Sequence, residues 1–369
     1  MRRALALARR GLGLTSPNPC VGAVLVRGGK IIGEGWHRRA GEAHAEVAAL
    51  RDVVGAVFNR DAISDRSRSR IQSAPTGVAN RATLYVTLEP CCTHGRTPPC
   101  TAAIIAAGIR RVVVAATDQN PKHRGRGLPL LRRAGIRVDT GLLAEEATAL
   151  NPAFNKWIVT GMPLVIAKAA FSLDGKMATH TGDSKWITSD TARKEAHRLR
   201  ATVDAIMVGA NTVIRDDPQL TLRHGVRGRQ PWRVVMDASG RCPITARLFA
   251  DNLRERTIVC TTARAPARWR RCLASRGIHV VIVPSNDRGV NLPAALRALG
   301  KLEVTSVLIE GGPSLLMAAF DAGVVDQVAF FYAPRVIAGA GMVATGTRWR
   351  GQWRRVGAGE MLFSGQRKE

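Results

Sequence analysis

Aromatic and acidic residues are scarce in this 369-residue chain. Aromatic side chains make up 5% of it, and 28 Asp and Glu accompany 55 Lys and Arg, so the formal net charge is +27. A surplus of this size suits nucleic acid or small anions as partners. Two Tyr and eight Phe offer few rings for base stacking, and the arginines are scattered rather than gathered in one block. We therefore expect phosphorylated small molecules rather than polynucleotides as partners.

Long hydrophobic runs are also missing. No uncharged apolar stretch reaches the roughly 18 residues that a membrane-spanning helix needs. The first apolar run, Ala4 to Ala8, ends at Arg9 and is too short for the core of a signal peptide. The seven cysteines are odd in number, which argues against a disulfide framework. These features predict a cytoplasmic chain with no membrane partner.

Two common nucleotide signatures do not occur. No G-x-G-x-x-G follows an expected strand, and there is no G-x-x-x-x-G-K-[ST], so the sequence carries neither a Rossmann fingerprint nor a P-loop. Gly311-Gly312 instead separates an expected strand from a helix that begins near Ser314. Paired glycines there can bring backbone N–H groups to an anion, or can simply form a tight turn.

Strands and helices alternate along the whole chain, and this predicts α/β sheets covered by helices on both faces. A helix over Arg2 to Gly11, a hairpin turning at Gly28-Gly29, and a loop over 59–81 are expected first. The tail from Arg348 onward shows no clear pattern of a helix or a strand. We expect a linker between Leu150 and Pro163, which divides the chain into domains 1–150 and 151–369.

A possible metal site stands out in the first half. His44-Ala45-Glu46 opens an expected helix, and Pro90-Cys91 follows an expected strand, with Cys100 at the next helix start. One imidazole and two thiolates can hold zinc with a fourth position open for water. Glu46, two residues after the histidine, can act as general acid–base beside it. This order of residues matches the H-x-E…P-C signature of zinc deaminases.

Alternatives to this interpretation exist. Cys92 is a rival ligand, although two adjacent cysteines rarely reach one metal without strain. Eight residues separate Cys91 from Cys100, whereas nucleic-acid and cytidine deaminases commonly have P-C-x-x-C. A zinc deaminase acting on RNA or DNA is the main rival function. A closed structural zinc module would need four protein ligands, and three can be named.

Longer motifs place the chain near one family. PNPCVGAVLV, GEGWHRRAGEAHAEVAAL and LEPCCTHGRTPPC closely resemble the deaminase half of the bifunctional riboflavin-biosynthesis deaminase-reductases. AFSLDGKMATHTGDSKWITS, VGANTVIRDDPQLTLR and IEGGPSLL resemble the reductase half. The resemblance implies a three-layer α/β/α cytidine-deaminase-like domain followed by a dihydrofolate-reductase-like α/β domain. The first would deaminate a phosphoribosylaminopyrimidine with zinc, and the second would reduce its ribosyl group to ribityl with NADPH. The resemblance is also compatible with a homo-oligomer.

The resemblance also implies roles for individual residues. In the deaminase, the implied zinc ligands are His44, Cys91 and Cys100, and the implied acid–base residue is Glu46. The implied pyrimidine contacts are Asn18 and His37. The expected reductase substrate contacts are Lys168, Ser184, Arg200, Leu220, Arg223 and Glu310. The expected coenzyme contacts are Ala170, Trp186, Thr212, Asp216, Ala238, Gly312, Pro313, Ser314, Leu315, Leu316, Met317 and Ala318.

Overall fold

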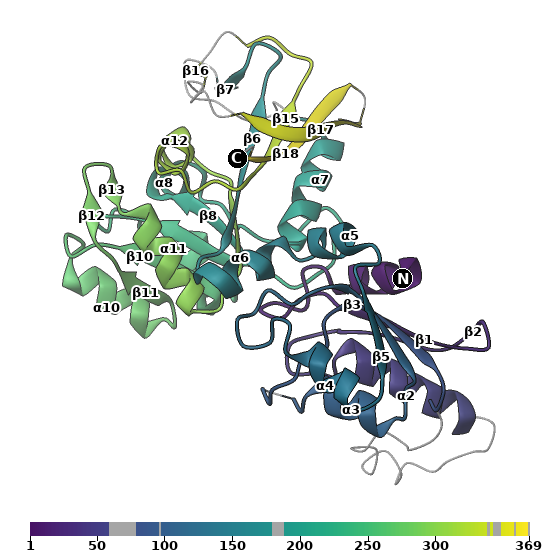
Figure 1. Cartoon of the computed structure of the whole chain (residues 1–369). Helices are drawn as coiled ribbons and strands as arrows, with labels where there is room; N and C mark the ends of the chain where they lie inside the picture. Colours follow the sequence, from purple (N-terminus) through teal and green to yellow (C-terminus); the bar gives the residue numbers. More distant parts are fainter. Residues whose placement is uncertain are drawn as a thin grey trace. The chain divides into compact units, whose positions relative to one another are not determined.

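The computed structural model describes residues 1–58, 79–95, 97–178, 188–337, 340–341, 348–357 and 359–367. They form two compact units, Met1–Thr160 and Gly161–Glu369, called unit 1 and unit 2 below (Figure 1). Of the expected loop at 59–81, residues 59–78 lie outside the described part, and Ala79 is buried within a turn over residues 79–81. Among the described residues, no helix is long and apolar enough to cross a membrane.

Unit 1 is built on a five-stranded sheet with strand order β2-β1-β3-β4-β5. The first two strands are the expected antiparallel hairpin, in which Arg27 pairs with Lys30 across Gly28-Gly29. Both glycines have positive φ, +56° and +74°, which is the backbone that a tight two-residue hairpin turn requires. Strands β3, β4 and β5 then pair in parallel. The bounds are β1 Gly22–Arg27, β2 Lys30–Trp36, β3 Thr83–Leu88, β4 Arg111–Ala116 and β5 Arg137–Thr140.

Helices cover both faces of this sheet, which confirms the three-layer expectation. Alternate residues of β1 show why: Val24 packs with Ala4 and Leu7 of the first helix, whereas Ala23 and Leu25 pack on the other side in the main core. The helices are α1 Arg2–Ala8 with a 3₁₀ turn at Arg9–Gly11, α2 Ala45–Phe58, α3 Cys100–Ala106, α4 Gly127–Arg133, α5 Ala144–Ala149 and α6 Pro152–Thr160.

The division between the units falls at Thr160/Gly161, ten residues after the expected 150/151 division but inside the expected linker. The segment after residue 150 belongs to unit 1 because it is tied there. The Asn151 side chain accepts a hydrogen bond from the Cys20 backbone N–H (2.6 Å) and donates to the Cys20 carbonyl (3.0 Å). Phe154 is buried as well. A cut at 150/151 would therefore remove α6 and its anchor from unit 1.

Unit 2 is built on a nine-stranded sheet with strand order β11-β10-β9-β8-β14-β6-β15-β18-β17. The strands from β11 to β15 are all parallel, as the alternation of strands and helices predicted. The bounds are β6 Leu164–Phe171, β8 Ala205–Gly209, β9 Trp232–Met236, β10 Thr257–Thr261, β11 His279–Ile282, β14 Ser306–Ile309 and β15 Gln327–Tyr332. The pairs β7 Lys176–Ala178 with β16 Ala340–Gly341, and β12 Ser285–Asn286 with β13 Gly289–Val290, form separate two-stranded ribbons.

The two faces of the parallel sheet bury separate cores. Met207 points into a core with Leu296 and Leu316, while its neighbours Ile206 and Val208 point into another with Phe249. This is the period-two alternation of a strand buried on both sides. The helices are α7 Asp190–Ala201, α8 Ala210–Asp216, α9 Arg247–Ala250, α10 Ala267–Ser275, α11 Leu292–Lys301 and α12 Pro313–Asp321, with a 3₁₀ turn at Arg254–Arg256.

The C-terminal tail forms an antiparallel hairpin that was not predicted. Strands β17 Trp349–Val356 and β18 Glu360–Arg367 extend the sheet beyond β15. Six of the eight β17 residues are exposed, so the strand lacks the alternation of apolar residues that identifies a half-buried strand. The buried Glu360 accepts hydrogen bonds from the backbone N–H and hydroxyl of Ser189, the N-cap of α7.

Candidate active sites

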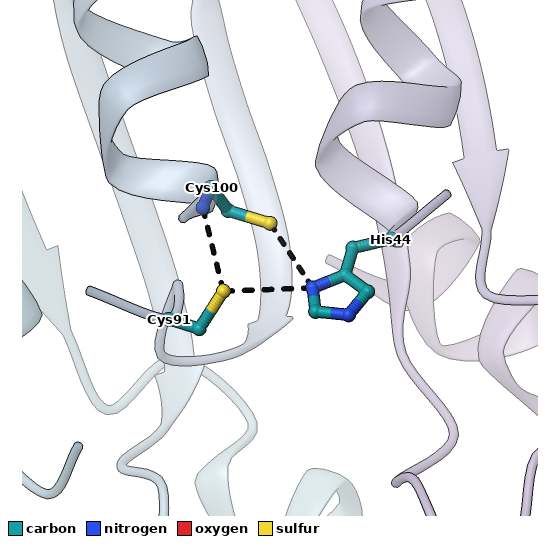
Figure 2. A group of neighbouring side chains, drawn as sticks. All are labelled: His44, Cys91 and Cys100. Carbon is teal, nitrogen blue, oxygen red and sulfur yellow. Dashed lines mark hydrogen bonds between the residues drawn. The ribbon is translucent and has the colours of Figure 1, made fainter. Parts of the chain in front are cut away.

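Three potential metal-ligand atoms lie close together in unit 1. Figure 2 shows His44, Cys91 and Cys100, whose ligand atoms all lie within 4.8 Å of one another. His44 Nδ1 is 3.2 Å from Cys100 Sγ and 3.5 Å from Cys91 Sγ. The Cys100 backbone N–H, at the start of α3, donates to Cys91 Sγ over 3.3 Å. One imidazole and two thiols in this arrangement fit zinc, with room for a non-protein fourth ligand.

The ring of His44 is held from its other side. Thr97 Oγ1 lies 3.2 Å from His44 Nε2, so Nδ1 is the nitrogen that faces the two sulfurs. A partner on the second ring nitrogen fixes both the tautomer and the orientation of a metal-binding histidine. Thr97 was missed in the sequence because a hydroxyl between Arg96 and Pro98 resembles an ordinary turn residue.

The electrostatics of the cluster favour the thiolate form of Cys91, whereas the hydrogen bond with Cys91 and burial raise the pKa of the Cys100 thiol. A hydrogen bond with the Cys100 thiol, aided by His44, lowers the pKa of the Cys91 thiol to about 4 against the opposing effect of burial. Glu46 is buried on the first turn of α2, and burial together with the charge of Cys91 raises the pKa of its carboxyl to about 6. A carboxyl with a pKa near neutrality can both accept and return a proton.

Cys92, the rival ligand, is not part of the cluster. Its Sγ lies 3.9 Å from His123 Nδ1, and it is absent from the group of possible metal ligands found among the described residues. Backbone geometry explains this, because consecutive side chains in an extended loop point to opposite sides.

Asn18 and His37, the two expected pyrimidine contacts, lie together. Asn18 Nδ2 is 3.0 Å from His37 Nε2, and His37 Nδ1 is 3.1 Å from the Ala43 carbonyl. A carbonyl only accepts, so Nδ1 carries the proton and Nε2 accepts from the Asn18 amide. Burial lowers the pKa of His37, which keeps the ring neutral. The His37 ring meets the His44 ring edge-on at 5.2 Å, so the pair borders the metal-ligand cluster.

Unit 2 contains a cavity of about 1090 Å³ at the carboxyl ends of its parallel strands. Glu310 follows β14, Lys168 lies on β6, and Arg200 lies on α7. Arg200 forms two hydrogen bonds to the Glu310 carboxylate, of 2.6 and 2.7 Å, and a third to the Thr221 carbonyl of 2.9 Å. Carboxyl ends of parallel strands are where α/β sheets usually bind ligands.

Charge balance keeps this network ionised. Burial acts to raise the pKa of Glu310, but Arg200 and Lys168 outweigh it and hold the pKa at about 2. Burial lowers the pKa of Lys168, and the charge of Glu310 opposes that shift. The cavity therefore presents fixed charges of both signs to a polar substrate.

Glycine is required where the cavity meets α12. A Cβ atom on Gly311 would lie 2.8 Å from Val208 Cγ1 and 3.0 Å from Thr212 Oγ1. Gly312, the N-cap of α12, has a φ of +67°. The backbone at this helix start lines the cavity, and such a position suits a phosphate group. The residues present therefore fit a phosphate-bearing coenzyme.

Most of the expected reductase residues line this one cavity: Lys168, Ala170, Arg200, Thr212, Asp216, Arg223, Ala238, Glu310, Gly312, Pro313, Ser314, Leu315 and Ala318. Leu220 and Leu316 are buried in the hydrophobic cores instead, and Met317 is not among the lining residues. Ser184 and Trp186 lie outside the described residues.

The sequence missed several polar residues of the cavity. They include His197, Asn211, Arg241 and Asn286, which come from four separate segments. His197 Nδ1 accepts a hydrogen bond of 3.0 Å from the Arg223 backbone N–H and so fixes the segment that carries Arg223. Asn211 stands beside Thr212 in a motif quoted above, whereas no local motif identifies the other three, because strand order brings their segments to one edge.

Comparisons with known proteins match this geometry. Residues 1–116 match the cytidine and deoxycytidylate deaminase zinc-binding region, and residues 163–358 match the RibD C-terminal domain. The riboflavin biosynthesis protein RibD of Aquifex aeolicus is 43% identical over 91% of this chain and 86% of its own length. RibD of Escherichia coli is 39% identical over 91% of this chain and 87% of its own length.

Two solved structures agree over the full length. RibD of Acinetobacter baumannii superposes with a TM-score of 0.84 at 34% identity and covers 100% of this chain and 97% of its own. A diaminohydroxyphosphoribosylaminopyrimidine deaminase/5-amino-6-(5-phosphoribosylamino)uracil reductase of Thermotoga maritima gives a TM-score of 0.81 at 35% identity, with the same coverage. A zinc deaminase domain and a reductase domain thus follow one another in this chain, which belongs to the RibD family of bifunctional riboflavin-biosynthesis enzymes.

Proposed function

We propose that unit 1 hydrolytically deaminates 2,5-diamino-6-(5-phosphoribosylamino)pyrimidin-4-one and that unit 2 then reduces the ribosyl group of the product to ribityl with NADPH. The observation that carries the first half is the convergence of His44, Cys91 and Cys100 beside a buried Glu46. The Thermotoga relative named for both activities supports this order of reactions. The rival reading, a deaminase acting on nucleic acid, leaves the cavity of unit 2 without a role.

In unit 1, His44, Cys91 and Cys100 would hold zinc, which supplies a nucleophilic water at neutral pH. Glu46 would take a proton from the attacking water and return it to the departing amine, which leaves as ammonia. Its position at the helix start, two residues beyond His44, keeps the carboxyl near the cluster without making it a ligand. Asn18 and the neutral His37 would orient the pyrimidine ring by hydrogen bonds.

In unit 2, NADPH would supply a hydride to C1′ of the ribosyl group; the bond from C1′ to the ring oxygen opens, and that oxygen takes up a proton. The Arg200–Glu310 pair and Lys168 would bind the ribose and phosphate of the substrate, with Arg223 at the same end of the cavity. The start of α12, from Gly312 to Ala318, would border the coenzyme phosphates, which the backbone N–H groups of Gly312 and Ser314 could bind. Pro313 has no N–H, and the N–H groups of Leu315 and Leu316 donate to the Gly312 carbonyl. Ala170, Thr212, Asp216 and Ala238 would line the rest of the coenzyme site. Ser184, Trp186, Leu220, Leu316 and Met317 remain predicted contacts.

The test is a two-part assay of the purified chain. Ammonia release from the diaminopyrimidine substrate should need zinc but not NADPH. NADPH oxidation should begin only after deamination, or at once when the deaminated intermediate is supplied. Ammonia release from cytidine in an oligonucleotide, with none from the small substrate, would instead favour the nucleic-acid interpretation. A cytoplasmic location and a possible homo-oligomer stay predictions.

A further inference from the structure

The order of strands in unit 2 indicates on which side of β14 the adenosine half of a bound coenzyme would lie. The proposed substrate contacts are Lys168, on β6, and Glu310, directly after β14; they are level because Ala167 pairs with Ile309. The nicotinamide must face the substrate, and the proposed phosphate loop at Gly311-Gly312 follows β14. The adenosine half must therefore extend the other way, over β8 and β9. Strand β9 lies two strand spacings, or about 10 Å, from β14, on the side away from β6.

A rigid turn follows β9 at that end of the cavity. The buried Asp237 carboxylate accepts hydrogen bonds from the backbone N–H groups of Ser239 (3.3 Å), Gly240 (3.0 Å) and Cys242 (2.8 Å). The Trp269 indole N–H donates to the Cys242 carbonyl over 2.9 Å. Arg241 lies inside this turn, so its backbone is fixed from both sides while its exposed side chain lines the cavity.

The guanidinium of Arg241 is held by a neutral group. Its Nη2 donates over 2.9 Å to Oδ1 of Asn211, an exposed residue in the first turn of α8. Three other arginines of the cavity have carboxylate partners: Arg200 pairs with Glu310, Arg193 with Asp190, and Arg288 with Asp321. Among the described residues, no ion pair to Arg241 is found. Its charge is thus available to a ligand anion.

We propose that Arg241 binds the 2′-phosphate of the coenzyme's adenosine ribose and thereby sets a preference for NADPH over NADH; this rests on the proposed reductase function of unit 2. A planar guanidinium on a fixed turn suits a phosphate dianion, to which it can donate two parallel hydrogen bonds. Arg215 is the competing cation. It lines the same cavity but lies near the end of α8, one helical turn beyond Asn211.

The test uses the full-length enzyme and the deaminated intermediate. In Arg241→Gln we expect the ratio of kcat/KM for NADPH to that for NADH to fall about 10- to 100-fold, the usual weight of a charged hydrogen bond. Arg241→Lys should keep part of the preference. Arg215→Gln, and Arg271→Gln on the outer helix α10, should keep the wild-type ratio.

A binding measurement separates phosphate recognition from damage to the turn. By calorimetry, wild type should bind adenosine 2′,5′-bisphosphate more tightly than 5′-AMP, and Arg241→Gln should lose most of this difference. Three results would each overturn the assignment. These are an unchanged NADPH-to-NADH ratio of kcat/KM in Arg241→Gln, an equal weakening of adenosine 2′,5′-bisphosphate and 5′-AMP binding in that variant, and a loss of the NADPH preference in Arg215→Gln instead. A wild-type enzyme that oxidises neither coenzyme would instead refute the proposed reductase function itself.

Discussion

The two units organise their chemistry in different ways. In unit 1 four side chains gather at one place: His44 and Glu46 at the start of α2, Cys100 at the start of α3, and Cys91 in the loop before α3. In unit 2 a cavity of about 1090 Å³ collects charged residues from the ends of many strands and helices. The first arrangement concentrates function in a few irreplaceable atoms. The second spreads binding over many contacts, so each should matter less.

The largest effect should come from a metal ligand. Cys100→Ser should lose zinc and essentially all deamination, because the zinc supplies the nucleophile. Metal analysis and ammonia release measure the two losses. Cys92→Ser is the matched control, since its sulfur lies beside His123 rather than in the cluster. Loss of stoichiometric zinc in the control would mean that the ligand set is wrong.

The next effect should come from the acid–base residue. Glu46→Gln should keep zinc yet lower kcat for deamination by about 10²- to 10⁴-fold, the usual contribution of a positioned general acid–base. Single-turnover ammonia release at saturating substrate would show the loss. Wild-type kcat in this variant would remove Glu46 from the mechanism.

The sequence predicted the metal site well because its ligands occur in local motifs: His44 and Glu46 share one turn, and Cys91 and Cys100 bracket one loop. The cavity could be anticipated only through family resemblance. His197 and Arg241 join it because strand order places distant segments side by side, and nothing near them in sequence shows this. The exposed, arginine-rich β17 was missed for the same reason, since its pairing with β18 is what makes it a strand.

A moderate effect is expected from the central ion pair of unit 2. Glu310→Gln leaves Arg200, whose side chain is 12% exposed, without its countercharge. Breaking a buried pair in this way should lower the free energy of unfolding by about 3 kcal/mol and raise KM for the reductase substrate. Urea unfolding and steady-state kinetics measure both. Glu34→Gln, which breaks a more exposed pair with Arg3, should leave the unfolding midpoint unchanged.

The smallest effect concerns pH. Burial, with Arg200 and His224 nearby, lowers the pKa of His197 to about 4, below its usual value near 6.5. The unfolded chain therefore binds more protons than the folded chain between those values, and stability falls as pH drops from about 6.5 to 4. His197→Asn keeps an acceptor for the Arg223 N–H but cannot titrate. The unfolding midpoint of this variant should fall less than that of the wild type between pH 6.5 and 4. A pH profile identical to that of the wild type would mean that His197 does not cause the loss of stability.

The separation of the two chemistries is tested most directly by assaying both activities on full-length Cys100→Ser. Given the diaminopyrimidine substrate, this variant should release no ammonia and oxidise no NADPH. Given the deaminated intermediate, it should oxidise NADPH at the wild-type rate, because the cavity of unit 2 contains none of the metal ligands. Wild-type ammonia release, or a folded variant that cannot reduce the supplied intermediate, would contradict the account.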